Sequence, residues 1–145
     1  MSNGSRRSLL FRRNAAGGRT NSSAPSKAKQ DLTATVRVEQ EVTIVEVSGR
    51  IVGGEEASLL RDRIKWLLHS TTNVILNLSG ITFIDSAGLG ILVSTWTSSK
   101  SVGKALKFAS VRGRVKQLLD TTRLSSIFEI YDDVDQAITN VAKKK

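Results

Sequence analysis

The sequence contains no cysteine and only one histidine among its 145 residues. The missing cysteines exclude disulfide bonds, thiol nucleophiles and thiolate metal sites. His69 cannot assemble a metal site alone, and its place at the end of an expected helix suits the helix dipole. A chain without cysteine also suits the reducing cytoplasm, which is the compartment that we expect.

Long apolar runs are missing as well. No stretch approaches the roughly 18 apolar residues that a membrane-spanning helix requires, so membrane association is not expected. The stretch 5–11 carries the paired arginines of a twin-arginine export signal. However, Arg12, Arg13 and Asn14 follow where such a signal needs an apolar segment, and we therefore expect no export.

Acidic residues are scarce: 13 Asp and Glu stand against 22 Lys and Arg, and the net charge is +9. Residues 1–31 hold seven of the basic residues and only Asp31 as an acid. This segment is rich in Ser, Asn, Gly and Arg, so we expect a disordered basic tail. Such a tail can contact nucleic acid or anionic lipid, although a solvated extension is the simpler interpretation. The domain itself is not expected to bind nucleic acid directly.

Residues 32–142 are expected to form a single domain, because a chain of this length can bury a core without crosslinks. Alternating or β-branched apolar residues predict strands at 35–39, 42–48, 73–78, 105–109 and 127–130. Apolar residues at helical spacing predict helices at 55–69, 86–102, 112–120 and from 132 onward. Short turns are expected at Gln40-Glu41 and Ser79-Gly80.

The predicted order β-β-α-β-α-β-α-β-α favours a mostly parallel or mixed sheet with right-handed crossovers. The opening hairpin should supply an antiparallel edge. In the helix that begins at Ser86, the residues expected to face the core are Leu89, Leu92, Val93 and Trp96.

The hexapeptide Asp85-Ser86-Ala87-Gly88-Leu89-Gly90 joins a strand-like run to a helix-like run. Asp or Ser at a helix start commonly caps free backbone N–H groups. If Asp85 is the cap, the Ser86 hydroxyl projects outward, and the glycines let another protein's active site approach. A phosphate on Ser86 would meet unpaired N–H groups and add about −1.5 to −2 charge beside Asp85. Such a change can abolish docking of a partner.

The same hexapeptide also fits a purely structural strand-to-helix turn. It is not a nucleophile elbow, because the residues around the serine are Ile84-Asp85-Ser86-Ala87-Gly88 and His69 joins no visible triad. There is no Walker-type phosphate loop, and Asp85 lacks the neighbouring acid that a phosphoaspartate receiver needs. We therefore expect no enzymatic activity, no cofactor and no metal site.

Residues 76–90 (LNLSGITFIDSAGLG) closely resemble the signature stretch of STAS domains, which occur in anti-sigma-factor antagonists, sulphate transporters and stressosome proteins. Residues 45–51 resemble the second strand of this family, and residues 112–131 its closing third. The resemblance covers about residues 32–142. It implies an α/β, STAS-like single domain with a mixed, mostly parallel sheet of about five strands and about four helices mainly on one side.

The resemblance further implies an anti-sigma factor antagonist that works by partner switching. Such an antagonist binds an anti-sigma factor, typically a serine kinase, and thereby frees a sigma factor. Phosphorylation of the serine in the D-S-x-G motif, Ser86 here, ends the binding, and a phosphatase restores it. The implied partner-binding residues are Asp85, Ala87, Gly88, Leu89, Gly54 and Glu55. The alternative is a non-switching STAS subunit of a stressosome-like or membrane transport-associated complex.

One departure from the family pattern concerns the loop that docks the partner. Family members with a kinase partner often carry an acidic residue soon after the Gly-Arg of the second strand. Here Ile51-Val52-Gly53-Gly54 follows Gly49-Arg50, and the acids Glu55 and Glu56 come slightly later.

Overall fold

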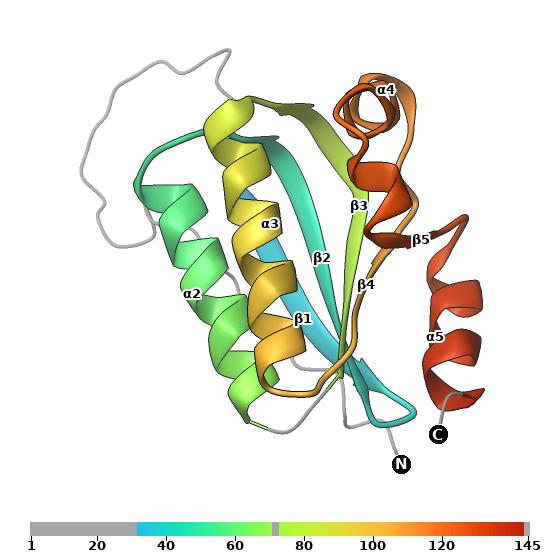
Figure 1. Ribbon diagram of the computed structural model, residues 1–145. Coiled ribbons are helices and arrows are strands. Elements are labelled where there is room, and N and C mark those ends of the chain that lie inside the picture. Colours follow the sequence, from blue (N-terminus) through green and yellow to red (C-terminus); the bar gives the residue numbers. More distant parts are fainter. Residues whose placement is uncertain (1–31, 71–72, 144–145) are drawn as a thin grey trace.

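Five strands form one sheet in the computed structural model, which describes residues 32–70 and 73–143 (Figure 1). The strands lie in chain order: β1 (Thr33–Glu39), β2 (Val42–Ile51), β3 (Asn73–Ile84), β4 (Leu106–Ala109) and β5 (Glu129–Tyr131). β1 pairs antiparallel with β2, and every other neighbouring pair is parallel. The predicted mixed sheet with an antiparallel edge is therefore confirmed. The expected tail at 1–31 lies outside the described residues, and the domain limits of 32–142 stay a prediction.

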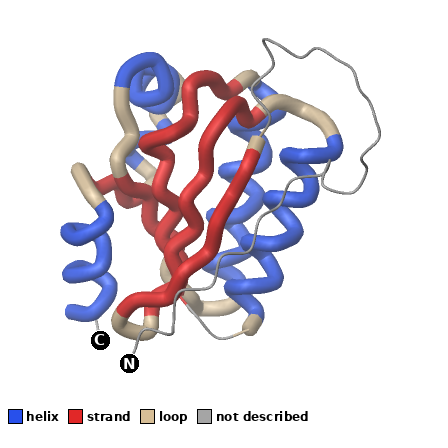
Figure 2. Tube along the Cα trace, turned by 180° about the vertical axis from the view of Figure 1, so that it is seen from behind, coloured by secondary structure: helices blue, strands red, loops and turns tan. Residues whose placement is uncertain are grey.

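Four α-helices connect and follow these strands within the described residues: α2 (Glu55–His69), α3 (Ser86–Ser101), α4 (Gly113–Thr121) and α5 (Val134–Lys143). Figure 1 shows α2 and α3 side by side across one face of the sheet. Seen from behind in Figure 2, the strands face the viewer and α5 lies beside them. Three helices cover one face and α5 covers part of the other, which agrees with the expectation of helices mainly on one side.

Each face of the sheet has its own apolar core, because successive strand residues point to opposite faces. The larger core joins strand residues such as Val45, Leu76 and Phe108 to Leu92 of α3 and Leu119 of α4. The smaller core lies under α5 and consists of Val42, Ile44, Ile75, Ala109, Ala137, Ile138 and Val141. The last three of these recur at helical spacing, which explains why α5 packs on this face.

The predicted turn at Ser79-Gly80 is wrong, because β3 runs without interruption from Asn73 to Ile84. The register with β2 shifts between Glu46 and Ser48 instead, which is a bulge rather than a turn. A Cβ on Gly80 would lie 2.9 Å from the Ser48 Cβ. The small residues at this point therefore allow two strands to approach closely, and β3 continues to the start of α3.

The predicted inward face of α3 is only partly correct. The buried residues are Gly88, Leu92, Thr95 and Ser99, whereas Leu89, Val93 and Trp96 are half-buried at the margin of the core. The Thr95 hydroxyl donates to the Leu92 carbonyl oxygen at 2.9 Å, and the Ser99 hydroxyl donates to the Trp96 carbonyl oxygen at 2.6 Å. Because these hydroxyls find partners within their own helix, they can face the core without an unpaired polar group.

The final strand also differs from its prediction of 127–130. A 3₁₀ turn, η3 (Leu124–Ser126), comes first, and β5 starts only at Glu129. Phe128 is buried and stacks on Phe108 with ring centroids 4.5 Å apart. Ile127 is exposed. Of the apolar pair at 127–128, only Phe128 lies in the core, and neither residue belongs to a strand.

Candidate functional site

Ser86 stands where the carboxyl ends of two parallel strands meet. Ile51, the last residue of β2, lies opposite Ile84, the last residue of β3. The backbone N–H of Asp85 donates to the Ile51 carbonyl oxygen at 3.2 Å, and α3 begins at the next residue. We call residues 51–55 and 85–90 the Ser86 site. β2 reaches this site only because it extends three residues beyond its predicted end at residue 48.

Asp85, one of the two residues that the sequence offered as a cap, is the N-cap of α3. Its Oδ1 accepts a hydrogen bond from the Gly88 N–H at 2.8 Å, and its Oδ2 accepts one from the Gly53 N–H at 3.3 Å. One carboxylate therefore fixes the first turn of α3 and ties it to the loop after β2. Ser86 is exposed, and its hydroxyl has no hydrogen-bond partner in the described part of the chain. The hydroxyl is thus free to react.

Replacing Asp85 with alanine should lower the free energy of unfolding by about 1 to 2 kcal/mol, because the backbone N–H groups of Gly88 and Gly53 would both lose their acceptor. Asp85→Asn keeps an oxygen in the capping position, so its free energy of unfolding should fall by less. Urea unfolding of the two variants beside the wild type measures the difference. Equal stability of all three proteins would show that this carboxylate does not hold the turn.

Gly88 is buried directly against the end of β2. A Cβ at this position would lie 2.0 Å from the Ile51 carbonyl oxygen and 2.9 Å from the Ile51 carbonyl carbon. The space beside Gly88 is therefore filled by the chain's own strand, whereas a Cβ on Gly90, the other glycine expected to leave room for a partner, would meet nothing within 4 Å. Gly88 offers no side chain to a partner and instead allows α3 to begin close to β2.

The loop after β2 supplies the other side of the Ser86 site. A Cβ on Gly53 would lie 2.9 Å from the Ala87 Cβ, so the two segments touch. Gly54 has a positive φ of 142°, which favours glycine, and it precedes the first residue of α2, Glu55. Gly54, Glu55 and Ala87 are exposed at this edge, whereas Leu89 is half-buried.

A groove beside the Ser86 site was not foreseen from the sequence. It has a volume of about 460 Å³ and lies between the end of β3 and α4, lined by Phe83, Ile84, Arg114, Val115, Gln117, Leu118 and Thr121. Phe83 is 40% exposed, and the Arg50 guanidinium carbon lies 5.2 Å from the centre of its ring. An exposed Phe two residues before the capping Asp is the only sequence signal of this groove, since the other wall depends on where α4 packs.

Within residues 32–70 and 73–143, no group of three or more His, Asp or Glu side chains could hold a metal ion. No helix in the same ranges is long and apolar enough to cross a bilayer. The Ser86 site presents one exposed hydroxyl on a turn that the Asp85 carboxylate fixes through two backbone donors.

Comparisons with known proteins show which family this chain resembles. A putative anti-sigma factor antagonist of Thermotoga neapolitana is 34% identical over 82 residues, which cover 53% of this chain and 73% of the relative. The anti-sigma-B factor antagonist of Bacillus subtilis is 28% identical over 103 residues, covering 68% of this chain and 92% of the relative. The crystal structure of an anti-sigma factor antagonist from Mycobacterium paratuberculosis matches with a TM-score of 0.68 and 26% identity, covering 77% of this chain and 95% of that one. The model of the STAS domain family matches residues 33–137. This match spans most of the sequence, and the chain therefore belongs to the STAS domain family.

Proposed function

We propose that this chain is an anti-sigma factor antagonist whose partner binding is switched by phosphorylation of Ser86. The observation that carries the proposal is the exposed, unpaired Ser86 hydroxyl on a turn fixed by the two hydrogen bonds of Asp85. Relatives that are 28 to 34% identical are named as antagonists of anti-sigma factors, which supports the same role here.

The surroundings of Ser86 suit attack by a protein kinase. Ala87, Gly90, Gly53 and Gly54 are exposed and carry at most a methyl group, so no large side chain blocks a kinase cleft. In the proposed reaction, the Ser86 oxygen forms a bond to the γ-phosphorus of ATP held by the kinase. The bond to the β-phosphate oxygen breaks, ADP leaves, and the hydroxyl proton passes to a base of the kinase. This chain is the substrate and supplies no catalytic group.

A phosphate on Ser86 would alter the docking surface more than the fold. It would lie at the N-terminus of α3, where free N–H groups and the helix dipole tolerate an anion. It would also bring about −1.5 to −2 charge next to Asp85, and a partner fitted to a neutral serine would have to desolvate that charge. Binding would then be lost while the domain stays folded, and removal of the phosphate would restore it.

The partners implied by this cycle are a serine-kinase anti-sigma factor and a phosphatase, acting together in the cytoplasm. The unphosphorylated chain would hold the anti-sigma factor and so release a sigma factor for transcription. Asp85, Ala87, Leu89, Gly54 and Glu55 would form the contact surface around Ser86. Gly88 would act beneath that surface by setting the position of α3.

Phosphorylation itself can be tested by intact-mass spectrometry after incubation with ATP and an extract of the source organism. The wild type should gain one phosphoryl group that fragment spectra place on Ser86, and Ser86→Ala should not gain it. Ser101→Ala is the matched control, because Ser101 is an exposed serine at the opposite end of the same helix. This control should be phosphorylated like the wild type.

Two results of this experiment would contradict the proposal. One is a wild-type chain that gains no phosphate at Ser86 under conditions in which the kinase is active. The other is a Ser86→Ala protein that is phosphorylated elsewhere to the same extent. Either result would favour a non-switching STAS subunit of a larger assembly.

A further inference from the structure

Two exposed arginines, Arg50 and Arg114, lie at the groove, and the exposed Arg112 comes two residues before Arg114. Arg50 is the penultimate residue of β2, Arg112 precedes α4, and Arg114 lies in the first turn of α4. None of the three forms an ion pair with a residue in the described ranges, although Arg50 lies over the ring of Phe83. Their positive charges are therefore not neutralised by the fold.

The other charges near this rim are already engaged. Lys116 pairs with Asp120 at 3.3 Å, and hydrogen bonds from Ser125 and Lys116 hold the pKa of Asp120 below its ordinary value. That carboxylate stays ionised and offsets the charge of Lys116. Both oxygens of the Asp85 carboxylate accept backbone hydrogen bonds, and Glu55 also has an interaction partner. Arg50, Arg112, Arg114 and Lys116 together outnumber Asp85, Asp120 and Glu55 by one, so the net formal charge of these residues is positive.

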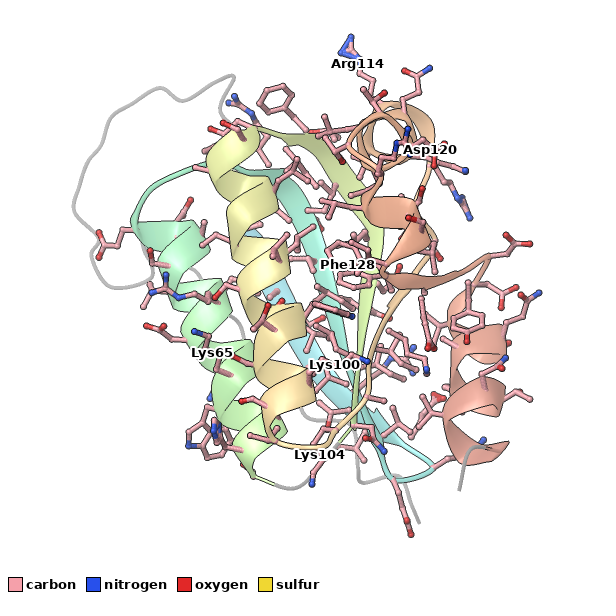
Figure 3. The ribbon with its side chains drawn as sticks, in the orientation of Figure 1. Lys65, Lys100, Lys104, Arg114, Asp120 and Phe128 are labelled. Carbon is pink, nitrogen blue, oxygen red and sulfur yellow. The ribbon has the colours of Figure 1, made fainter. Side chains whose placement is uncertain are left out.

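The groove between the arginines is apolar at its base. Ile84 and Val115 are buried beneath it, at 5% and 3% exposure, while Phe83 and the half-buried Leu118 form its sides. Figure 3 shows Arg114 projecting from α4 at the end of the molecule where α3 begins, away from Lys65 and Lys104. An apolar base with guanidinium groups at the rim fits an apolar side chain flanked by carboxylates. Nucleic acid could use the charges but would leave the apolar base unfilled.

We propose that the Phe83–Leu118 groove and its arginine rim dock an acidic segment of the anti-sigma factor. An apolar side chain of that segment lies between Phe83 and Leu118, and its carboxylates face Arg50 and Arg114. This inference rests on the proposed function but specifies the chemistry of the partner rather than the switch.

The test is calorimetric titration of the full chain with the purified serine-kinase anti-sigma factors of the source organism. Each kinase is loaded with ADP so that no phosphoryl transfer occurs. Arg50→Glu and Arg114→Glu should weaken binding about tenfold or more, and the loss should shrink as salt rises. Lys65→Glu and Lys104→Glu are matched charge reversals away from the groove and should stay within about twofold of the wild type. Leu118→Ala tests the apolar seat and should also weaken binding.

The outcomes separate this inference from the switch. If Ser86→Asp abolishes binding while both arginine variants bind normally, the switch stands and the docking surface is wrong. If the arginine variants weaken binding while Ser86→Asp binds normally, the docking surface stands and the switch is wrong. If the lysine variants lose as much affinity as the arginine variants, the effect comes from the net charge of the chain and not from the groove, and the inference is overturned. Failure of every anti-sigma factor to bind the wild type, with arginine-dependent binding of a DNA duplex instead, would also overturn it.

Discussion

Replacing Gly88 with alanine is expected to lower the free energy of unfolding by about 3 kcal/mol, which is a large effect for the addition of one methyl group. The added Cβ would lie 2.0 Å from the Ile51 carbonyl oxygen. A Cβ has no rotamer by which it could escape, so the backbone of α3 or β2 would have to move. The same carbonyl accepts the Asp85 N–H, and a shift would therefore also disturb the turn that presents Ser86.

Gly90 provides the matched control two residues further along the same helix. A Cβ on Gly90 would meet nothing within 4 Å. Gly90→Ala should therefore raise the free energy of unfolding by about 0.5 to 1 kcal/mol, because alanine loses less conformational freedom in a helix. Urea unfolding of both variants measures the difference. A similar change in both would mean that α3 does not begin in close contact with β2.

Changing Ser86 to aspartate is expected to weaken binding of the anti-sigma factor about 100-fold relative to Ser86→Ala, or about 2.7 kcal/mol. Alanine removes the hydroxyl, keeps the surface neutral and cannot be phosphorylated, so this variant should bind as tightly as the wild type. Aspartate places one negative charge beside Asp85, which is less than the charge of a phosphate. Calorimetric titration of both variants provides the comparison.

Circular dichroism should show both Ser86 variants folded, since the Ser86 side chain is exposed and has no hydrogen-bond partner in the described ranges. A loss of binding in Ser86→Asp therefore reports the contact with the partner and not the fold. If the two variants bind equally, charge at this position does not control docking. The chain would then be better described as a non-switching STAS subunit of a larger assembly.

The parts of the fold that follow local rules were predicted well from the sequence. The predicted helix at 55–69 coincides with α2, because its apolar residues recur at helical spacing and two acids favour its start. The Asp85 cap was also one of the two options that the capping preference left open. The opening hairpin closes at Gln40-Glu41 as expected, and both residues adopt positive φ.

The parts that depend on distant contacts could not be predicted. The small pair Ser79-Gly80 has the composition of a turn, but the approach of β2 to β3 keeps it within a strand. Residue 88 must be glycine because a Cβ there would collide with the carbonyl oxygen of Ile51. Ile51 lies 37 positions earlier in the chain, so no local sequence pattern could predict this contact. The groove requires α4 to pack beside the end of β3, so the sequence could not show that Phe83 lines a groove.

The most direct test of the central claim compares one protein before and after modification. The full chain is phosphorylated at Ser86 until intact-mass spectrometry finds no unmodified protein, and its affinity for the ADP-loaded anti-sigma factor is measured beside that of the unmodified chain. We predict that the phosphorylated chain binds at least about 100-fold more weakly and that phosphatase treatment restores the original affinity. Equal affinity of the two forms would contradict the claim that Ser86 controls partner binding.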